Sequence, residues 1–147
     1  MGVFGKRSDE TFQEYRERSI NSISKSFCGA KWYNATIWLG NGTTASCHHP
    51  PAHKIPLDEV ANSYKALHNT TYKKAVRKEM LDGVRPKECE YCWKIEDLGD
   101  DKVSDRVYKS VIYTDEELIE AKDKFGAGLD VDLKTLEIAF DRTCQLA

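Results

Sequence analysis

The stretch FCGAKWYNATIWLGNGTTASC, residues 27–47, decides how this chain is expected to fold. A cysteine lies near each of its ends, Cys28 and Cys47, and the sequence GNG stands at 40–42. Residues 33–39 are aromatic, β-branched or apolar with partial alternation, which indicates a strand. Gly-Asn-Gly is a strong turn signal. We expect the chain to return as a second strand and to bring Cys47 back beside Cys28.

Two further cysteines stand close together as Cys89-x2-Cys92. This spacing lets two thiolates from one short turn reach the same metal ion. One pair is half of a four-thiolate site, and Cys28 and Cys47 are the candidates for the other half. We therefore expect Cys28, Cys47, Cys89 and Cys92 to bind one metal centre, either zinc or an iron–sulfur cluster.

Three histidines follow Cys47 directly, at positions 48, 49 and 53. Histidine beside cysteine raises the alternative of a mixed metal site. Four thiolates already close a tetrahedral site, so we interpret this stretch first as a polar loop stiffened by two prolines. His48 is the substitute ligand if one cysteine does not reach the metal.

The composition predicts a soluble, globular chain. Its 147 residues favour one domain with a modest core, and 40% of them are hydrophobic and 31% charged. A net charge of −2 gives no general attraction to nucleic acid or to an anionic membrane. No apolar run is long enough to span a bilayer, and the first residues do not resemble a secretory signal. We expect a cytoplasmic, reducing location, where paired cysteines favour metal over disulfides.

Several further elements are expected around the hairpin. Ser8 or Asp9 caps a helix that runs to about residue 24. Apolar residues at helical spacing predict a second helix over 57–68. The sequence TDEE at 114–117 is a capping box that opens a later helix. Together with a strand over 135–140, these elements predict an α+β fold.

A helix is also expected over residues 72–81, with Gly83 as its stop. One face of this helix carries four basic side chains: Lys73, Lys74, Arg77 and Lys78. Such a face either contacts an acidic partner or phosphate, or is simply solvated.

The spacing Cys28-x13-Gly42-x4-Cys47, then a helical gap and Cys89-x2-Cys92, resembles the auxiliary-cluster module of radical S-adenosylmethionine enzymes. That module is called SPASM in its full form and twitch in its shortened form. The likeness covers residues 27–93 and includes the RPK sequence that leads into the later pair. The full form has further cysteines soon after the pair, whereas here none follows Cys92 until Cys144. The likeness is therefore to the shortened, single-cluster form. It implies that the four cysteines hold a four-iron four-sulfur cluster, with zinc as the alternative.

Cys144 follows the expected last strand, in the sequence TCQLA at 143–147. This resembles the approach to the Cys-x3-Cys-x2-Cys motif, where three thiolates hold the cluster that binds S-adenosylmethionine. The resemblance implies an N-terminal fragment in which Cys144 is the first ligand of that motif. Residues 1–25 would be an N-terminal helix, 26–112 the twitch-like module, and 113–147 a helix and the first strand of a truncated barrel.

The resemblance implies electron relay or a structural role for the module, and no catalysis by this chain alone. S-adenosylmethionine would be bound only by the full-length parent. The implied partners are the rest of that parent and a peptide or protein substrate, with no membrane or nucleic acid. The alternative is a stand-alone, zinc-stapled interaction module that uses the basic helix. A cysteine hydrolase is a weaker hypothesis, because no cysteine stands apart as a nucleophile.

Overall fold

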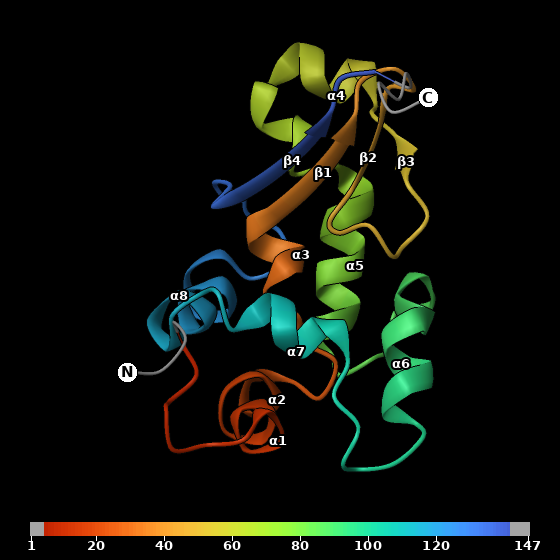
Figure 1. Ribbon diagram of the computed structural model, residues 1–147. Helices are drawn as coiled ribbons and strands as arrows, with labels where there is room; N and C mark the ends of the chain where they lie inside the picture. The colour runs from red at the N-terminus through yellow and green to blue at the C-terminus, as the bar shows by residue number, and fades with distance from the viewer. Residues whose placement is uncertain (1–4, 142–147) are drawn as a thin grey trace.

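The computed structural model describes residues 5–141, which form an α+β fold. A four-stranded sheet lies at one end of the molecule and most helices lie at the other, with α5 running between them (Figure 1). The strands follow the order β3-β2-β1-β4. Their bounds are Asn34–Trp38 for β1, Thr43–Ala45 for β2, His53–Lys54 for β3 and Thr135–Ala139 for β4. The predicted α+β class is confirmed.

Short helices make up the rest of the fold, and η marks 3-10 or π turns among them. They are α1 Phe12–Tyr15, η1 Arg16–Ile20, α2 Asn21–Ile23, α3 Ala30–Tyr33, α4 Leu57–Asn62, η2 Tyr64–Leu67, α5 Thr71–Leu81, η3 Lys87–Cys89, α6 Glu90–Glu96, α7 Asp105–Ser110, α8 Asp115–Glu120 and η4 Ala121–Phe125. In the part of the chain that the structure describes, none of these helices has the length and apolar character needed to cross a membrane.

The hairpin of β1 and β2 matches its prediction. The two strands pair antiparallel, with Thr36 opposite Ala45 and Trp38 opposite Thr43. Between them Gly42 has a φ of 64°, a left-handed conformation that glycine adopts without steric penalty. Because Gly42 permits this tight turn, the chain reverses at once and returns alongside β1.

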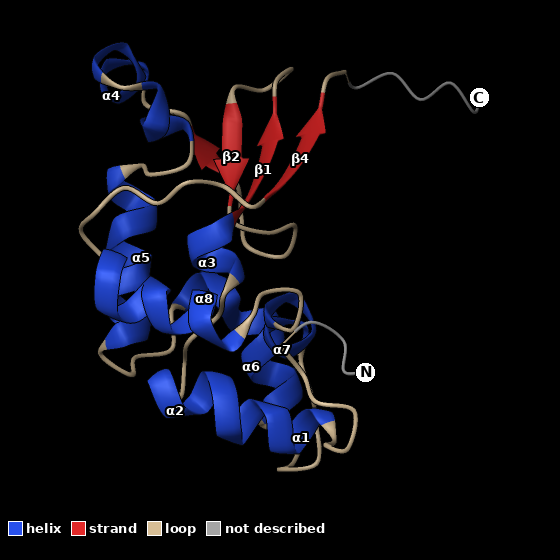
Figure 2. Ribbon diagram, turned by 90° about the vertical axis from the view of Figure 1, so that its left-hand side faces the viewer, coloured by secondary structure: helices blue, strands red, loops and turns tan. Residues whose placement is uncertain are grey.

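The predicted strand over 135–140 is also present, as β4. It pairs parallel to β1, with Asn34 opposite Thr135 and Trp38 opposite Ala139. β4 is an edge of the sheet, and Figure 2 shows it beside β1 with no helix of residues 5–141 beyond it. Its alternate residues Leu136 and Ile138 are exposed, so this strand leaves an uncovered apolar side.

The first helix begins later than its prediction. Thr11, not Ser8 or Asp9, is the cap: its hydroxyl accepts from the backbone N–H of Glu14, whose carboxylate accepts from the N–H of Thr11. This reciprocal capping box satisfies two otherwise unpaired donors, which a single Ser or Asp cap would not do. The predicted end near residue 24 is close to the observed one at Ile23.

The prediction of one continuous helix over residues 57–68 was wrong. It breaks at Ser63, whose extended backbone ends α4 and whose hydroxyl accepts from the N–H of Lys65 to start η2. Serine competes with helical hydrogen bonds in this way. The break turns Tyr64 outward, and it is 76% exposed instead of facing the core.

One hydrophobic core joins the helical end of the molecule. It includes Tyr15, Trp32, Trp93, Val107 and Leu118, so it draws on all three predicted segments of the chain. The predicted capping box at Thr114 is present and opens α8. The region around Val107, which the sequence left unassigned, is the helix α7.

α5 has its predicted extent, with Gly83 at φ 77° just beyond its end, but its basic face is not on the surface. Lys73 is 2% exposed and Arg77 is fully buried. Lys73 donates to the hydroxyl of Thr44, while Arg77 donates to the carbonyl of Lys31 and to Asn69 Oδ1. For Lys73 and Arg77 both interpretations of the face, partner contact and solvated surface, were therefore wrong, whereas Lys78 is exposed. The long cations instead satisfy acceptors inside the fold.

We predict that Arg77→Met lowers the free energy of unfolding by about 2–4 kcal/mol, because it leaves buried acceptors without donors. Lys78→Met is the matched control, since Lys78 is exposed and pairs with Asp82 only at the surface. That control should change stability by less than about 0.5 kcal/mol. Urea denaturation measures both, and equal effects would contradict the structural role of Arg77.

Candidate metal centre

All four predicted ligands line one small cavity of about 20 Å³. Cys28, Cys89 and Cys92 are buried, and Cys47 is half-buried. All four are free thiols with no disulfide between them. The four cysteines that the sequence spacing grouped together thus line a common space, and their binding of one metal centre stays a prediction.

The hairpin brings the two early cysteines together. Cys28 lies two residues before α3, which leads directly into β1. Cys47 lies two residues after β2, which returns along β1. Figure 1 shows α3 directly below β1, at the junction between the sheet and the helices.

The later pair reaches the cavity from a different direction. Pro86 precedes the 3-10 turn η3, which ends at Cys89, and Cys92 lies in the first turn of α6. Trp93 is buried against the same cavity, and its indole N–H donates to the carbonyl of Pro86. The tryptophan thus fixes the approach to the pair and excludes water on that side.

The turns around the early pair influence the protonation of the two thiols. Burial raises the pKa of Cys28 and of Cys47, and the backbone N–H groups of Ala30 and His49 respectively act against that rise. In both cases the N–H group lies two residues after the cysteine, so the local turn itself supplies it.

Side chains contribute to the environment of the later pair, Cys89 and Cys92. Burial raises the pKa of both thiols, while the ammonium of Lys31 acts to lower that of Cys89, and the backbone N–H of Arg106 and the hydroxyl of Ser104 act to lower that of Cys92. A neutral thiol is a weak acceptor, whereas charge-assisted bonds to an anion are stronger. These groups favour the thiolate form, whereas burial favours the thiol.

Positive side chains also line the cavity: Lys31, Arg106 and Lys109. Two of them are buried and paired, Lys31 with Glu88 and Arg106 with Glu96. Burial alone would lower the pKa of Lys31, but the nearby Cys89 and the Glu88 carboxylate outweigh burial and raise it. Lys31 therefore stays charged beside the sulfur.

Burial raises the pKa of all four thiols above the ordinary value, to about 12 for Cys89. Without a cation these groups are protonated at neutral pH. A bound metal ion stabilises the thiolate and displaces these protons, which makes metal binding proton-coupled. The chemistry of the donor set thus fits a cationic centre.

The spacing of the sulfurs is wider than a single ion needs. Within residues 5–141, one group of three or more side chains has its ligand atoms all within 4.8 Å of one another, and it contains no cysteine. No three of the four sulfurs lie that close together. Around one tetrahedral zinc the sulfurs would be about 3.8 Å apart, given Zn–S bonds of about 2.3 Å.

That close group contains His48, His49 and Asp105. His48 is exposed and does not line the cysteine cavity, so it is not placed as a substitute for a cysteine. His49 does line the cavity, together with Asp105. His53 points elsewhere, to the hydroxyl of Thr70. Cys144 lies outside the described residues.

Sequence reasoning missed several contributors to this site. Lys31 follows Cys28 closely but acts on the distant Cys89, and Ser104 and Arg106 come from the start of α7, so no local pattern marks their roles. Asp105 could have been suspected only from its place beside Ser104, the cap of α7. Comparisons with family models, with curated proteins and with solved structures find no match to this chain.

We predict that Lys31→Met lowers the free energy of unfolding of the metal-free chain by about 3–5 kcal/mol, because Glu88 then stays largely buried without its partner. The double variant Lys31→Met/Glu88→Gln should recover much of that loss, since it removes the uncompensated charge. Urea denaturation of both variants under reducing conditions measures this. A double variant that is no more stable than the single one would show that the pair does not act as a unit.

Proposed function

We propose that this chain is an auxiliary iron–sulfur module in which Cys28, Cys47, Cys89 and Cys92 hold one four-iron four-sulfur cluster. The single observation that carries the proposal is the convergence of the four cysteines on one cavity. When bound, the cluster would supply one-electron transfer.

The sulfurs stand farther apart than one zinc ion needs, but the cavity of about 20 Å³ is small for a four-iron cluster, so its side chains would have to move outward to hold one. In a four-iron cluster each thiolate binds a different iron, so the sulfurs stand farther apart than around one ion. The spacing described above, with no three sulfurs mutually within 4.8 Å, agrees with that requirement. Zinc remains the alternative occupant, because four thiolates suit it chemically.

The residues around the cavity have defined tasks in this proposal. Four protein ligands leave no open position, so the module relays electrons or holds the fold together instead of binding substrate at the metal. Trp93 excludes water, while Lys31 and Arg106 offset the negative charge of the thiolates. A cytoplasmic location would keep the thiols reduced and available.

The interaction-module alternative is weakened by the burial of its expected contact surface. Lys73 and Arg77 are inside the fold, and Lys74 pairs with Asp130. Of the four basic residues of α5, Lys78 alone is largely exposed. The basic helix therefore has little cationic surface to offer an acidic partner.

The parent enzyme belongs to the same proposal. β4 lies parallel to β1 with an uncovered apolar side, which supports its assignment as the first strand of a radical S-adenosylmethionine barrel. Cys144 would then begin the ligand set for the catalytic cluster. A radical S-adenosylmethionine enzyme that contains this module would bind S-adenosylmethionine and act on a peptide or protein.

The decisive experiment is anaerobic purification with iron, sulfide and zinc analysis and a visible absorption spectrum. We expect a brown protein with about four irons and four sulfides per chain. A colourless protein with about one zinc per chain would favour the zinc-stapled interaction module over the cluster proposal. A chain that holds neither, even after reconstitution with iron and sulfide, would overturn both.

We also predict that Cys47→Ser and Cys89→Ser each abolish most metal binding and lower the melting temperature of the loaded protein by about 10 °C or more, because metal binding contributes to folding. Cys144→Ser is the matched control and should leave the metal content of this site unchanged. Metal content and calorimetry measure the effects. Normal metal content with unchanged melting in both test variants would contradict the four-thiolate assignment.

A further inference from the structure

His48, His49 and Asp105 form a second cluster of metal-ligand side chains on the outer side of the cysteine cavity. One ligand atom from each lies within 4.8 Å of the other two. His49 Nε2 is 2.5 Å from Asp105 Oδ2, and the two imidazole rings have their centroids 4.1 Å apart. His48 is exposed and the other two are half-buried, so the cluster opens to solvent.

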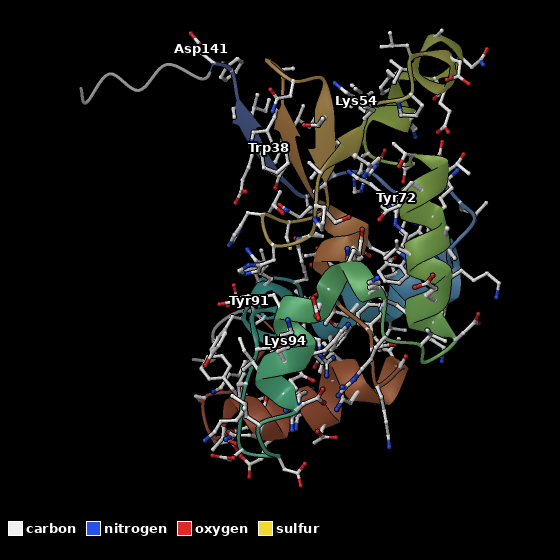
Figure 3. The ribbon with its side chains drawn as sticks, turned by 90° about the vertical axis from the view of Figure 1, so that its right-hand side faces the viewer. Trp38, Lys54, Tyr72, Tyr91, Lys94 and Asp141 are labelled. Atoms are coloured by element: carbon white, nitrogen blue, oxygen red, sulfur yellow. The ribbon has the colours of Figure 1, made fainter. Side chains whose placement is uncertain are left out.

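Surrounding contacts hold this cluster in place. The ring of His49 stacks on Tyr91, with centroids 3.8 Å apart and planes 12° from parallel. Figure 3 shows Tyr91 on α6, in the part of the molecule below the sheet. Pro50 is buried directly after the two histidines, and Asp105 begins α7. The side chains are therefore positioned before an ion arrives, which favours binding.

We propose that His48, His49 and Asp105 form an open site for a borderline divalent transition metal such as Zn²⁺. Two imidazoles and one carboxylate are a ligand set that such ions accept with positions left over for exchangeable ligands. Water would fill those positions in the isolated chain. The proposal of this site rests on its own geometry and holds whether the cysteines bind zinc or a cluster.

Lys109 opposes a cation at this site. Its ammonium is 3.4 Å from His48 Nδ1, directly beside one of the proposed ligand rings. A positive charge so close to a divalent ion weakens binding by direct repulsion. Removal of that charge should therefore strengthen binding, an effect of opposite sign to the loss of a ligand.

The test uses Co²⁺ as the probe, added anaerobically to protein whose cysteine site has first been filled. Cobalt bound to nitrogen and oxygen gives weak visible bands, whereas cobalt bound to thiolate adds intense charge-transfer absorption. The paramagnetic ion should also broaden the imidazole NMR signals of His48 and His49. The signals of buried His68 serve as the internal reference.

Four variants give the expected pattern of affinities. His48→Asn and Asp105→Asn should each weaken Co²⁺ binding by at least about tenfold. Lys109→Met should tighten it by about three- to tenfold. His53→Asn is the matched control and should change nothing, because His53 contacts Thr70 instead.

The outcomes separate this proposal from the cluster proposal. Spectra without thiolate bands, together with the pattern of affinities above, support the histidine site whatever the cysteines hold. Binding that survives both His48→Asn and Asp105→Asn, or no Co²⁺ bound beyond the thiolates, would overturn it. Iron and sulfide content, measured on the same samples, reports the cysteine site independently.

Discussion

The buried ion pair between Lys31 and Glu88 is the interaction on which the rest of this structure depends. The ammonium of Lys31 bonds Glu88 and acts against the burial that raises the pKa of Cys89, while its backbone carbonyl accepts from buried Arg77. Lys31 thereby joins three segments: its own helix α3, which leads into the hairpin; α5; and the turn that carries Cys89 and Cys92. A buried pair of this kind contributes little net stability by itself, but the loss of one partner is costly. Its role here is to fix how three separate segments meet.

Local signals in the sequence predicted the elements that depend on local chemistry. Gly42 and its neighbours specified the hairpin, Thr114 specified the start of α8, and Gly83 specified the end of α5. In each case one or two residues satisfy or release nearby backbone groups, and nothing distant is required. The convergence of the cysteines was predictable for a similar reason, because a hairpin and a short turn set most of it.

Long-range packing decided what the sequence could not show. Lys73 and Arg77 look like surface residues by composition, yet acceptors from distant segments draw them inside. The helix breaks at Ser63 because the serine hydroxyl competes with the helical hydrogen bonds, although the apolar spacing there is that of an ordinary helix. His49 and Asp105 meet across 56 positions of sequence, so no spacing rule links them. The metal itself and the parent enzyme stay predictions, since neither follows from the arrangement of these side chains alone.

Charge connects the two proposed sites. A thiolate site filled by zinc or by a cluster carries a formal charge of about −2. Glu88 and Glu96 already pair with Lys31 and Arg106, and among residues 5–141 no carboxylate forms an ion pair with the third cavity cation, Lys109. In the empty protein, that charge acts against a cation at the histidine site. Once the thiolates are loaded, their negative charge offsets Lys109 and favours a second cation nearby. By linkage the second ion would stabilise the first to the same extent, so the two sites would fill cooperatively.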